Sequence, residues 1–382
     1  MVLMKKRQAP TGAFKKVRTY MNAKELAIMS AETMMKKFAA PELPPVTKFH
    51  YHQGVFLSGM LHTWHLTGDK RYYDYVKAWV DSVMGEDGIP FNMETEALDD
   101  MQPGILLYEL YEKEGTPAYK KTLDKIIYHI DRWPTTAEGG FFHKDNGRSA
   151  NMWLDGMYMG GPVTVEYGVR FNRPDLFDVV HLQMSLMRDR ITDEKTGLMF
   201  HAYDLERKAE WADKVTGRAS HFWGRAMGWY AVAMFQIAEL LPDTYEKRDE
   251  FIKKGKELLE VLFKYQDKKT GLWYQVIDKT EDERNWHETS CSSLFLYALS
   301  IATRLGVFDK EAVRPIASLA FEGIKSKLNF GEDGYLGVSG VCIGTGVGNL
   351  EHYYARPTSE NDLHGVGAFL LMATEYARVF ER

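Results

Sequence analysis

Cysteine is scarce in this chain, since only Cys291 and Cys342 occur among its 382 residues. The two lie far apart and in no CxxC or zinc-type spacing, which excludes a disulfide framework and a cysteine-based structural metal. No GxSxG, HExxH or comparable nucleophile or metal motif occurs either. We therefore expect two reduced thiols, and a functional site that uses no metal and no cofactor.

Long hydrophobic runs and a strong excess of charge are also absent. No stretch approaches the length of a membrane span, and the basic N-terminus has no apolar run long enough for a signal peptide. The formal net charge of −5 gives no reason to expect a nucleic acid or an anionic membrane as partner. We therefore expect a cytoplasmic protein. Because no Ser/Gly linker occurs, we expect a single domain over residues 21–382, preceded by an arm over residues 1–20. The sequence does not indicate its oligomeric state.

The chain does contain a repeated helical pattern. Apolar residues recur at helical spacing in twelve segments, and credible strands are very few. The predicted helices cover residues 23–38, 51–67, 70–85, 101–114, 117–131, 155–170, 175–190, 222–241, 246–266, 287–305, 310–328 and 361–380. Twelve helices with short connectors indicate six antiparallel hairpins.

A glycine followed by apolar or aromatic residues recurs between these helices. It occurs in EDGIPF (86–91), GGFFHK (139–144), KTGLMFHAYD (195–204), KTGLWYQV (269–276) and EDGYLGV (332–338). This spacing is far longer than that of a solenoid repeat and fits a closed ring of helix pairs with each glycine turn at one rim. The loops that carry chemistry are then expected on one face of the ring.

Asp155 lies in the stretch SANMWLDGMYMGGP, residues 149–162, directly before a predicted helix. An acid at the mouth of a helix, beside the indole of Trp153 and followed by glycines that admit a ligand to the backbone, suits a sugar-processing site. The alternative is that Asp155 only caps the helix, because Asp is a preferred N-cap residue.

A second pair of acids, Asp99 and Asp100, precedes another predicted helix. Adjacent residues point in different directions, so at most one is expected to face a pocket while the other is available as a helix cap. If one of them approaches Asp155, mutual repulsion raises the pKa of one carboxyl and keeps it protonated near neutrality, as a general acid requires. We expect Asp155 to have this raised pKa.

Two histidines, His143 and His201, occur in equivalent glycine-aromatic phrases. A single loop histidine is usually a structural hydrogen-bonding group, but the repetition favours contacts with sugar hydroxyls or with a developing negative charge.

Another cluster, SHFWGRAMGWYAVAM, places Arg225 and Trp229 four residues apart on one helix face, with Trp223 just ahead. A guanidinium beside an indole suits a ligand that is both a ring and a carboxylate. The alternative is a cation–π contact on the helix surface. His364 begins the last predicted helix and is expected beside the first hairpin. The GTGVG stretch (344–348) lacks the Lys-Ser/Thr of a phosphate-binding loop, so we discard that interpretation.

Three motifs occur in order, WLDG at 153–156, HFWGRAMGWY at 221–230 and NDLHGVGAFLL at 361–371. Together they resemble the unsaturated rhamnogalacturonyl hydrolases, glycoside hydrolase family 105, and the resemblance runs from about residue 20 to the C-terminus. It implies an all-α fold, the (α/α)6 barrel, which agrees with the twelve predicted helices. It also implies that the small oligosaccharide substrate carries a 4,5-unsaturated uronic acid at its non-reducing end, and that the enzyme hydrates the vinyl ether instead of attacking the anomeric carbon.

The resemblance also implies roles for particular residues. Asp155 matches the general acid/base and Asp99, less securely, a second acid, because the alignment across the Asp-Asp pair could slip by one. The expected substrate-binding residues are Asp100, His143, Trp153, His201, Trp223, Arg225, Trp229 and His364.

The chemistry agrees with the residues present. The double bond is conjugated with the ring oxygen, so a proton delivered to carbon creates an oxocarbenium-like centre that needs no enzymic nucleophile. Three alternatives stay open: an unsaturated glucuronyl hydrolase acting on other uronides, a sugar isomerase or epimerase using His143, His201 and His364, and a non-catalytic carbohydrate-binding ring. The few Lys and Arg residues in the pocket loops favour an unsulfated sugar.

Overall fold

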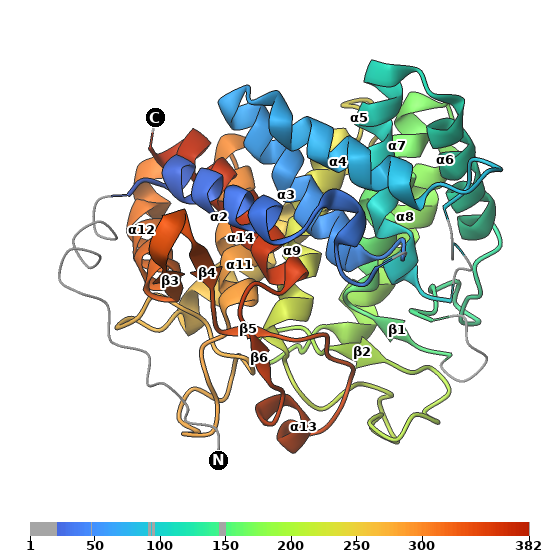
Figure 1. Ribbon diagram of the computed structural model, residues 1–382. Coiled ribbons are helices and arrows are strands. Elements are labelled where there is room, and N and C mark those ends of the chain that lie inside the picture. The colour runs from blue at the N-terminus through green and yellow to red at the C-terminus, as the bar shows by residue number, and fades with distance from the viewer. Residues whose placement is uncertain (1–20, 47, 91–92, 94–95, 145–149, 382) are drawn as a thin grey trace, which may run out of the picture.

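A computed structural model describes residues 21–46, 48–90, 93, 96–144 and 150–381, so the predicted arm over residues 1–20 lies outside the described residues. Helices dominate the described chain (Figure 1). They are α2 (Ala23–Lys37), α3 (Tyr51–Thr67), α4 (Lys70–Val83), α5 (Ile105–Glu114), α6 (Pro117–Ile130), α7 (Gly156–Arg170), α8 (Asp175–Ile191), α9 (Gly224–Leu240), α10 (Arg248–Leu262), α11 (Thr289–Arg304), α12 (Lys310–Ser326), α13 (Leu350–Tyr354) and α14 (Leu363–Phe380). All twelve predicted helices are confirmed, and the short α13 was not predicted.

The helices form two concentric rings. Helices α3, α5, α7, α9, α11 and α14 each pack against the next, and α14 packs back onto α3, which closes the inner ring. Each of the outer helices α2, α4, α6, α8, α10 and α12 packs on a helix of the inner ring that is its neighbour in the chain or, for α2, also on α14. This architecture is the expected (α/α)6 barrel.

Residue patterns explain which helices lie inside. Every residue of α14 except Arg378 is buried, as expected for a helix that is apolar all round. In α10, by contrast, the buried positions are limited to one stripe, Phe251, Gly255, Leu258, Leu259 and Leu262. A helix such as α14 can therefore bury its whole surface only in the inner ring, and an amphipathic helix such as α10 covers the ring with one face.

Helices α3 and α14 approach unusually closely. A Cβ atom on Gly367 would lie 2.5 Å from the backbone carbon of Val55, and one on Gly59 would lie 2.6 Å from Cβ of Leu370. Only glycine fits at such positions, so these two residues let the first and last inner helices meet. The meeting brings the N-terminal ends of α3 and α14 side by side.

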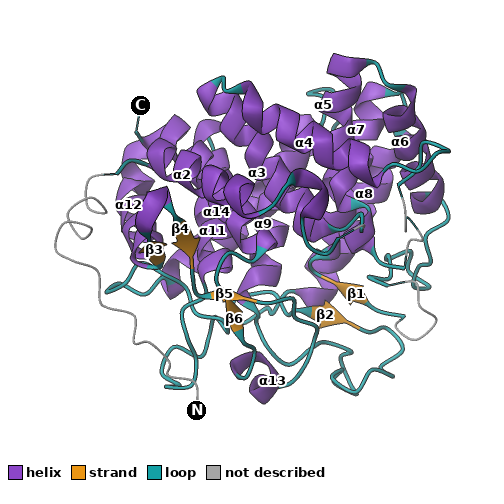
Figure 2. Ribbon diagram, viewed as in Figure 1, coloured by secondary structure: helices purple, strands orange, loops and turns teal. Residues whose placement is uncertain are grey.

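The strands are three short antiparallel pairs outside the helical rings (Figure 2). They are β1 (Met152–Trp153) with β2 (Ala202–Tyr203), β3 (Leu328–Phe330) with β4 (Leu336–Val338), and β5 (Val341–Cys342) with β6 (Thr358–Ser359). In Figure 1, β1, β2, β5, β6 and α13 gather at one end of the barrel. The predicted glycine turns are confirmed by positive φ angles at Gly88, Gly139, Gly197, Gly271 and Gly334.

Within the described part of the chain, no helix combines the length and the apolar character needed to cross a bilayer.

Candidate active site

A cavity of about 300 Å³ opens at the end of the barrel that carries the loops. Seven of the predicted site residues line it: Asp99, His143, Trp153, Asp155, Trp223, Arg225 and Trp229. A second cavity, of about 340 Å³, is lined by residues within the helices, including Glu109, Glu166 and Arg170. We place the candidate site in the first cavity because it combines two acids, a buried guanidinium and three indoles.

Asp155 is held between a strand and a helix. Strand β1 pairs with β2 so that Trp153 faces Ala202, and α7 begins directly after Asp155. Asp155 occupies the N-cap position of α7, but its side chain makes no capping hydrogen bond. The capping alternative is therefore wrong, and the carboxyl is 7% exposed and lines the cavity.

His201 lies behind Asp155 and does not line the cavity. Its Nε2 is 3.3 Å from Oδ2 of Asp155, and its Nδ1 is 2.8 Å from the hydroxyl of Tyr353 on α13. Burial lowers the pKa of the 0%-exposed imidazole, although Asp155 acts in the opposite direction. His201 is therefore neutral near pH 7 and fixes the carboxyl.

Asp99 reaches the cavity from a short 3-10 turn, Leu98–Asp100. Its Oδ1 lies 3.5 Å from Nε2 of His143, whose ring stacks on Trp153 at 4.3 Å between centroids. Burial would raise the pKa of Asp99, but the charge and hydrogen bond of His143, together with His50 and Lys144, lower it to about 2. Asp99 is therefore an anion at all ordinary pH values.

Asp100 does not share the position of its neighbour. Asp99 lines the cavity while Asp100 is absent from its wall, as expected for adjacent residues. Burial and then the charge of Asp99 raise the pKa of Asp100 to about 7. The carboxyl of Asp100, whose pKa is raised, thus lies away from the cavity. The carboxyl of Asp99, in the cavity wall, does not retain a proton.

Arg225 enters the cavity from the first turn of α9 and is 1% exposed. Its Nη1 donates to the carbonyl of Cys342 and to Nε2 of His364, and its Nη2 donates to the carbonyl of Ile343 at 2.7 Å. The guanidinium lies over the ring of Trp223, 4.5 Å from its centroid. The alternative of a surface cation–π contact is therefore wrong, because this contact is buried.

Trp229 is separate from this stack. Its ring lies on that of Tyr158, with centroids 4.6 Å apart, and also lines the cavity. The four-residue spacing from Arg225 thus brings both side chains to the same cavity without joining them in one stack.

No carboxylate of the described residues lies within ion-pair distance of Arg225. Burial acts to lower the pKa of Arg225, but charges that include Glu288 raise it overall. The carboxylate of Glu288 accepts the N–H groups of Ser290, Cys291 and Cys342. One N–H of Nη2 and the Nε–H make no hydrogen bond to the described chain. A buried guanidinium is thus left with donors for a ligand.

His364 does not reach the cavity either. It is 0% exposed and contacts Arg225 through Nε2. Of the ten predicted site residues, seven line the cavity. His201 and His364 contact Asp155 and Arg225 without lining the cavity, and Asp100 stands apart from it.

The sequence reasoning missed several residues of the cavity wall. Tyr51 and its neighbours His50 and His52 come from the start of α3, where FHYHQG concentrates four aromatic or imidazole rings in six residues. Lys144 and Met159 also contribute. The final missed part is the loop 344–346 within the stretch discarded as a phosphate-binding loop.

Arg356 holds this last loop in place. Its guanidinium donates to the carbonyl of Gly344 and to Oγ1 of Thr345. The phosphate-loop interpretation remains excluded, but the glycines still matter because they bring backbone to the cavity.

Comparison with known proteins places the chain in a family. The family described as Glycosyl Hydrolase Family 88 matches residues 27–380. The chain is 26% identical over 335 residues to the unsaturated rhamnogalacturonyl hydrolase YesR of Bacillus subtilis, covering 86% of this chain and 90% of that one. It is 22% identical to the unsaturated 3S-rhamnoglycuronyl hydrolase of Formosa agariphila, over 74% of this chain and 70% of that protein.

Solved structures of related proteins share the fold of this chain. A glycoside hydrolase from family 105 of C. acetobutylicum superposes with a TM-score of 0.87 at 31% identity, covering 93% of this chain and 99% of that chain. The unsaturated glucuronyl hydrolase of Bacillus sp. GL1 shares the fold, with a TM-score of 0.70 at 12% identity over 94% of this chain and 97% of that chain. The chain therefore belongs to glycosyl hydrolase family 88, with family 105 among its relatives, and is a glycosidase of the unsaturated uronyl hydrolase type.

Proposed function

We propose that this enzyme removes the 4,5-unsaturated galacturonyl residue from the non-reducing end of lyase-generated rhamnogalacturonan oligosaccharides. One observation supports the substrate class above all others: Arg225 is a buried cation without a carboxylate partner in the described chain, and it shares a cavity with Asp155. A buried charge needs a partner, and the carboxylate of an unsaturated uronic acid supplies one when the substrate binds.

Asp155 is the proposed general acid and base. Its proton goes to C4 of the substrate, the π electrons of the double bond form the new C–H bond, and positive charge develops at C5 and the ring oxygen. Water then adds its oxygen to C5, and its proton goes to the Asp155 carboxylate. The resulting hemiketal opens and the neighbouring sugar is released, so the carboxyl ends the cycle protonated as it began.

His201 and Tyr353 orient this carboxyl. The hydroxyl of Tyr353 accepts the N–H of Gly348, so its own O–H is available for Nδ1 of His201. We infer that the proton of neutral His201 is on Nε2, where it faces Oδ2 of Asp155. The other carboxyl oxygen makes no hydrogen bond to the described residues and is available to the substrate.

Asp99 has a different role from that of an acid. Because its pKa is lowered to about 2, it is ionised and has no proton to give. An anion fixed in the cavity wall stabilises the positive charge that develops at C5 and the ring oxygen. Asp99 is thus proposed as an electrostatic group, with His143 and Trp153 holding its position.

The finer substrate assignment rests on two further points. The relative YesR is a rhamnogalacturonyl hydrolase by name, and the chain covers 90% of its length. Apart from Arg225, Lys144 is the one Lys or Arg side chain among the described residues that line the cavity. A sulfated sugar would need more positive charge than this, so an unsulfated substrate is favoured.

The test is a panel of unsaturated disaccharides followed by their ultraviolet absorbance. We expect the absorbance of unsaturated galacturonyl-rhamnose to fall fastest, with a slower fall for unsaturated glucuronides and none for a saturated control. Absence of a fall with every unsaturated uronide would refute the proposal. Preference for an unsaturated glucuronide would retain the chemistry and change the linkage and the leaving sugar.

The variant Asp155→Asn tests the central role of this carboxyl. An amide of the same shape has no transferable proton, so kcat is expected to fall by about a thousandfold. Binding of the unsaturated disaccharide and the helical circular-dichroism spectrum should stay as in the wild type. A variant with near-normal kcat would remove Asp155 from the mechanism.

A further inference from the structure

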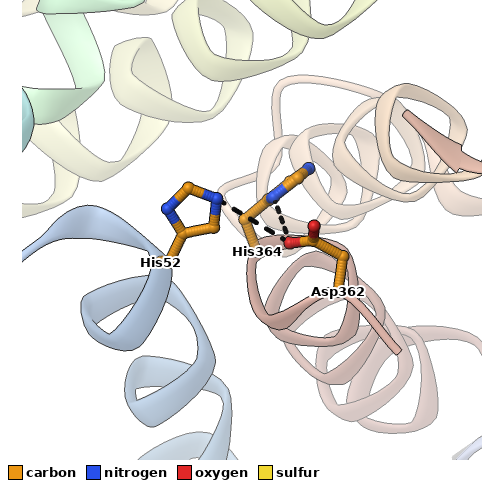
Figure 3. A group of neighbouring side chains, drawn as sticks. All are labelled: His52, Asp362 and His364. Atoms are coloured by element: carbon orange, nitrogen blue, oxygen red, sulfur yellow. Dashed lines mark ion pairs between the residues drawn. The ribbon is translucent and has the colours of Figure 1, made fainter. Parts of the chain in front are cut away.

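Three polar side chains converge where the first and last inner helices meet (Figure 3). His52 comes from the first turn of α3, and Asp362 and His364 come from the start of α14. Oδ1 of Asp362 lies 2.7 Å from Nδ1 of His364 and 3.8 Å from Nε2 of His52. These ligand-type atoms all lie within 4.8 Å of one another, a spacing that a metal ion could bridge.

Arg225 argues against a metal at this cluster. Its Nη1 lies 2.9 Å from Nε2 of His364, and a guanidinium can only donate. Nε2 must therefore accept, which means that a neutral His364 carries its proton on Nδ1. A metal bound to Nδ1 would require loss of that proton as well, and hence an imidazolate ring.

The same constraint indicates what the carboxylate of Asp362 does beside His364. Nδ1 of His364 is in ion-pair contact with Oδ1 of Asp362 at 2.7 Å, and neither atom has an aligned hydrogen-bond partner among the described residues. Burial would raise the pKa of Asp362, but the interaction with His364 and the positive charge of Arg225 lower it, so this group is an anion. An anion beside Nδ1 favours the tautomer whose Nε2 accepts from Arg225.

The other groups packed around His364 are neutral. The ring of His52 lies 5.2 Å from that of His364, and that of Tyr51 lies 6.0 Å away. Burial lowers the pKa of His52 to about 3 and raises that of Tyr51. The charges next to His364 are therefore the Asp362 anion on one side and the Arg225 cation on the other.

The geometry points to Asp362 and His364 as positioning residues that orient the Arg225 guanidinium toward the carboxylate of the substrate. Three acceptors, the carbonyls of Cys342 and Ile343 and Nε2 of His364, hold the guanidinium plane. Its unused N–H groups are thereby kept for the ligand. The inference rests on the proposed function for the identity of that ligand, and His364 itself does not touch the cavity.

The test uses two variants of His364 whose amide side chains differ in length. In His364→Gln the amide oxygen can take the place of Nε2 and accept from Arg225, whereas in His364→Asn the amide reaches only the place of Nδ1. Each variant is assayed with an unsaturated galacturonyl disaccharide as the free acid and as its methyl ester, because the ester lacks the negative charge that Arg225 binds.

We expect His364→Asn to lose about tenfold or more in kcat/KM for the acid, mainly through KM, and little for the ester. His364→Gln should stay within about threefold of the wild type for both. Asp362→Ala should show the same losses in kcat/KM as His364→Asn, because without the carboxylate the proton of His364 is no longer held on Nδ1. Equal losses for acid and ester, or a Gln variant as impaired as the Asn variant, would overturn the inference.

Nitrogen NMR of histidine-labelled enzyme tests the tautomer without any turnover. The signal that disappears in His364→Gln should show a neutral ring protonated on Nδ1, and Asp362→Ala should move the proton to Nε2. A ring protonated on Nε2 in the wild type would overturn the inference, as would loss of wild-type activity on treatment with a metal chelator. A wild-type enzyme inert toward both acid and ester would refute the proposed function. The inference about Asp362 and His364 would then be decided by the NMR measurement of the His364 tautomer alone.

Discussion

Asp99 and Asp100 are neighbours in the chain, yet the pKa values of their carboxyls move in opposite directions. His143 outweighs the effect of burial at Asp99, while at Asp100 burial and the charge of Asp99 act together. The outcome depends on which carboxyl meets the imidazole. That contact is set by the long-range pairing in which the N–H of Leu98 donates to the carbonyl of His143, and it cannot be deduced from the Asp-Asp sequence.

The raised pKa of Asp100 predicts a pH-dependent stability. Its folded pKa of about 7 lies above the ordinary value of 3.8, so between these values the folded state binds more protons than the unfolded state. The free energy of unfolding therefore falls as pH rises from about 4 to about 7. Asp100→Asn removes this loss, and at pH 8 it should be more stable than the wild type by on the order of 2 kcal/mol.

Urea denaturation of both proteins at pH 4 and at pH 8 measures this effect. The two should differ little at pH 4, where Asp100 is protonated in the native state. Parallel pH dependence of wild type and variant would contradict the raised pKa.

Helices α3 and α14 meet through glycine, and this contact also joins His52 to His364. Gly367→Ala places a methyl group 2.5 Å from the backbone of Val55, so one helix must move. We expect a loss of about 2–3 kcal/mol in the free energy of unfolding, together with weaker binding of the unsaturated substrate. Both are measured on one preparation, by denaturant titration and by KM.

Gly160→Ala in α7 is the matched control. The nearest atom to its new methyl group would be Leu98 Cδ2 at 3.6 Å, an ordinary contact. Alanine also favours a helix over glycine by about 1 kcal/mol, so this variant should be as stable as the wild type or more so. A Gly367→Ala protein equal to this control would show that the close approach of the two helices is not needed.

The twelve long helices could be predicted because their evidence is local. Apolar spacing marks them, and caps such as Asp69 and Asp309 hydrogen-bond to the first turns of α4 and α12. Helix α13 has an N-cap, Asn349, but its five residues are too few for apolar spacing to mark it, yet it supplies Tyr353 to His201 from 152 positions away. Contacts of that range depend on the closed ring, so the supporting roles of His201 and His364 could not be separated from direct binding in advance.

At the scale of the whole molecule, the ring is closed by the two ends of the described chain. The N–H of Ala23, at the start of α2, donates to the carboxylate of Glu381 at 2.9 and 3.0 Å, just after α14. The family match over residues 27–380 covers the same span. We propose that residues 21–382 form a single catalytic domain to which residues 1–20 contribute little.

Deletion of residues 1–20 tests this division. The shortened protein should unfold in one cooperative transition, with a midpoint within about 2 °C of that of the full chain, because the packing of the ring is complete without them. Its kcat/KM for an unsaturated disaccharide should match as well. A lower midpoint or a second transition would assign the segment to the fold.

The position of His364 near the end of the ring has a consequence for synthesis of the protein. Arg225 is translated long before His364, which accepts a hydrogen bond from its guanidinium and lies in α14, the last inner helix to be synthesised. A growing chain that has not reached Leu363 already contains Arg225 and the carbonyls of Cys342 and Ile343 that accept from its guanidinium, but it lacks Nε2 of His364. The set of acceptors is completed only with the final helix, so a prematurely terminated chain is expected to bind the uronate more weakly than the finished enzyme.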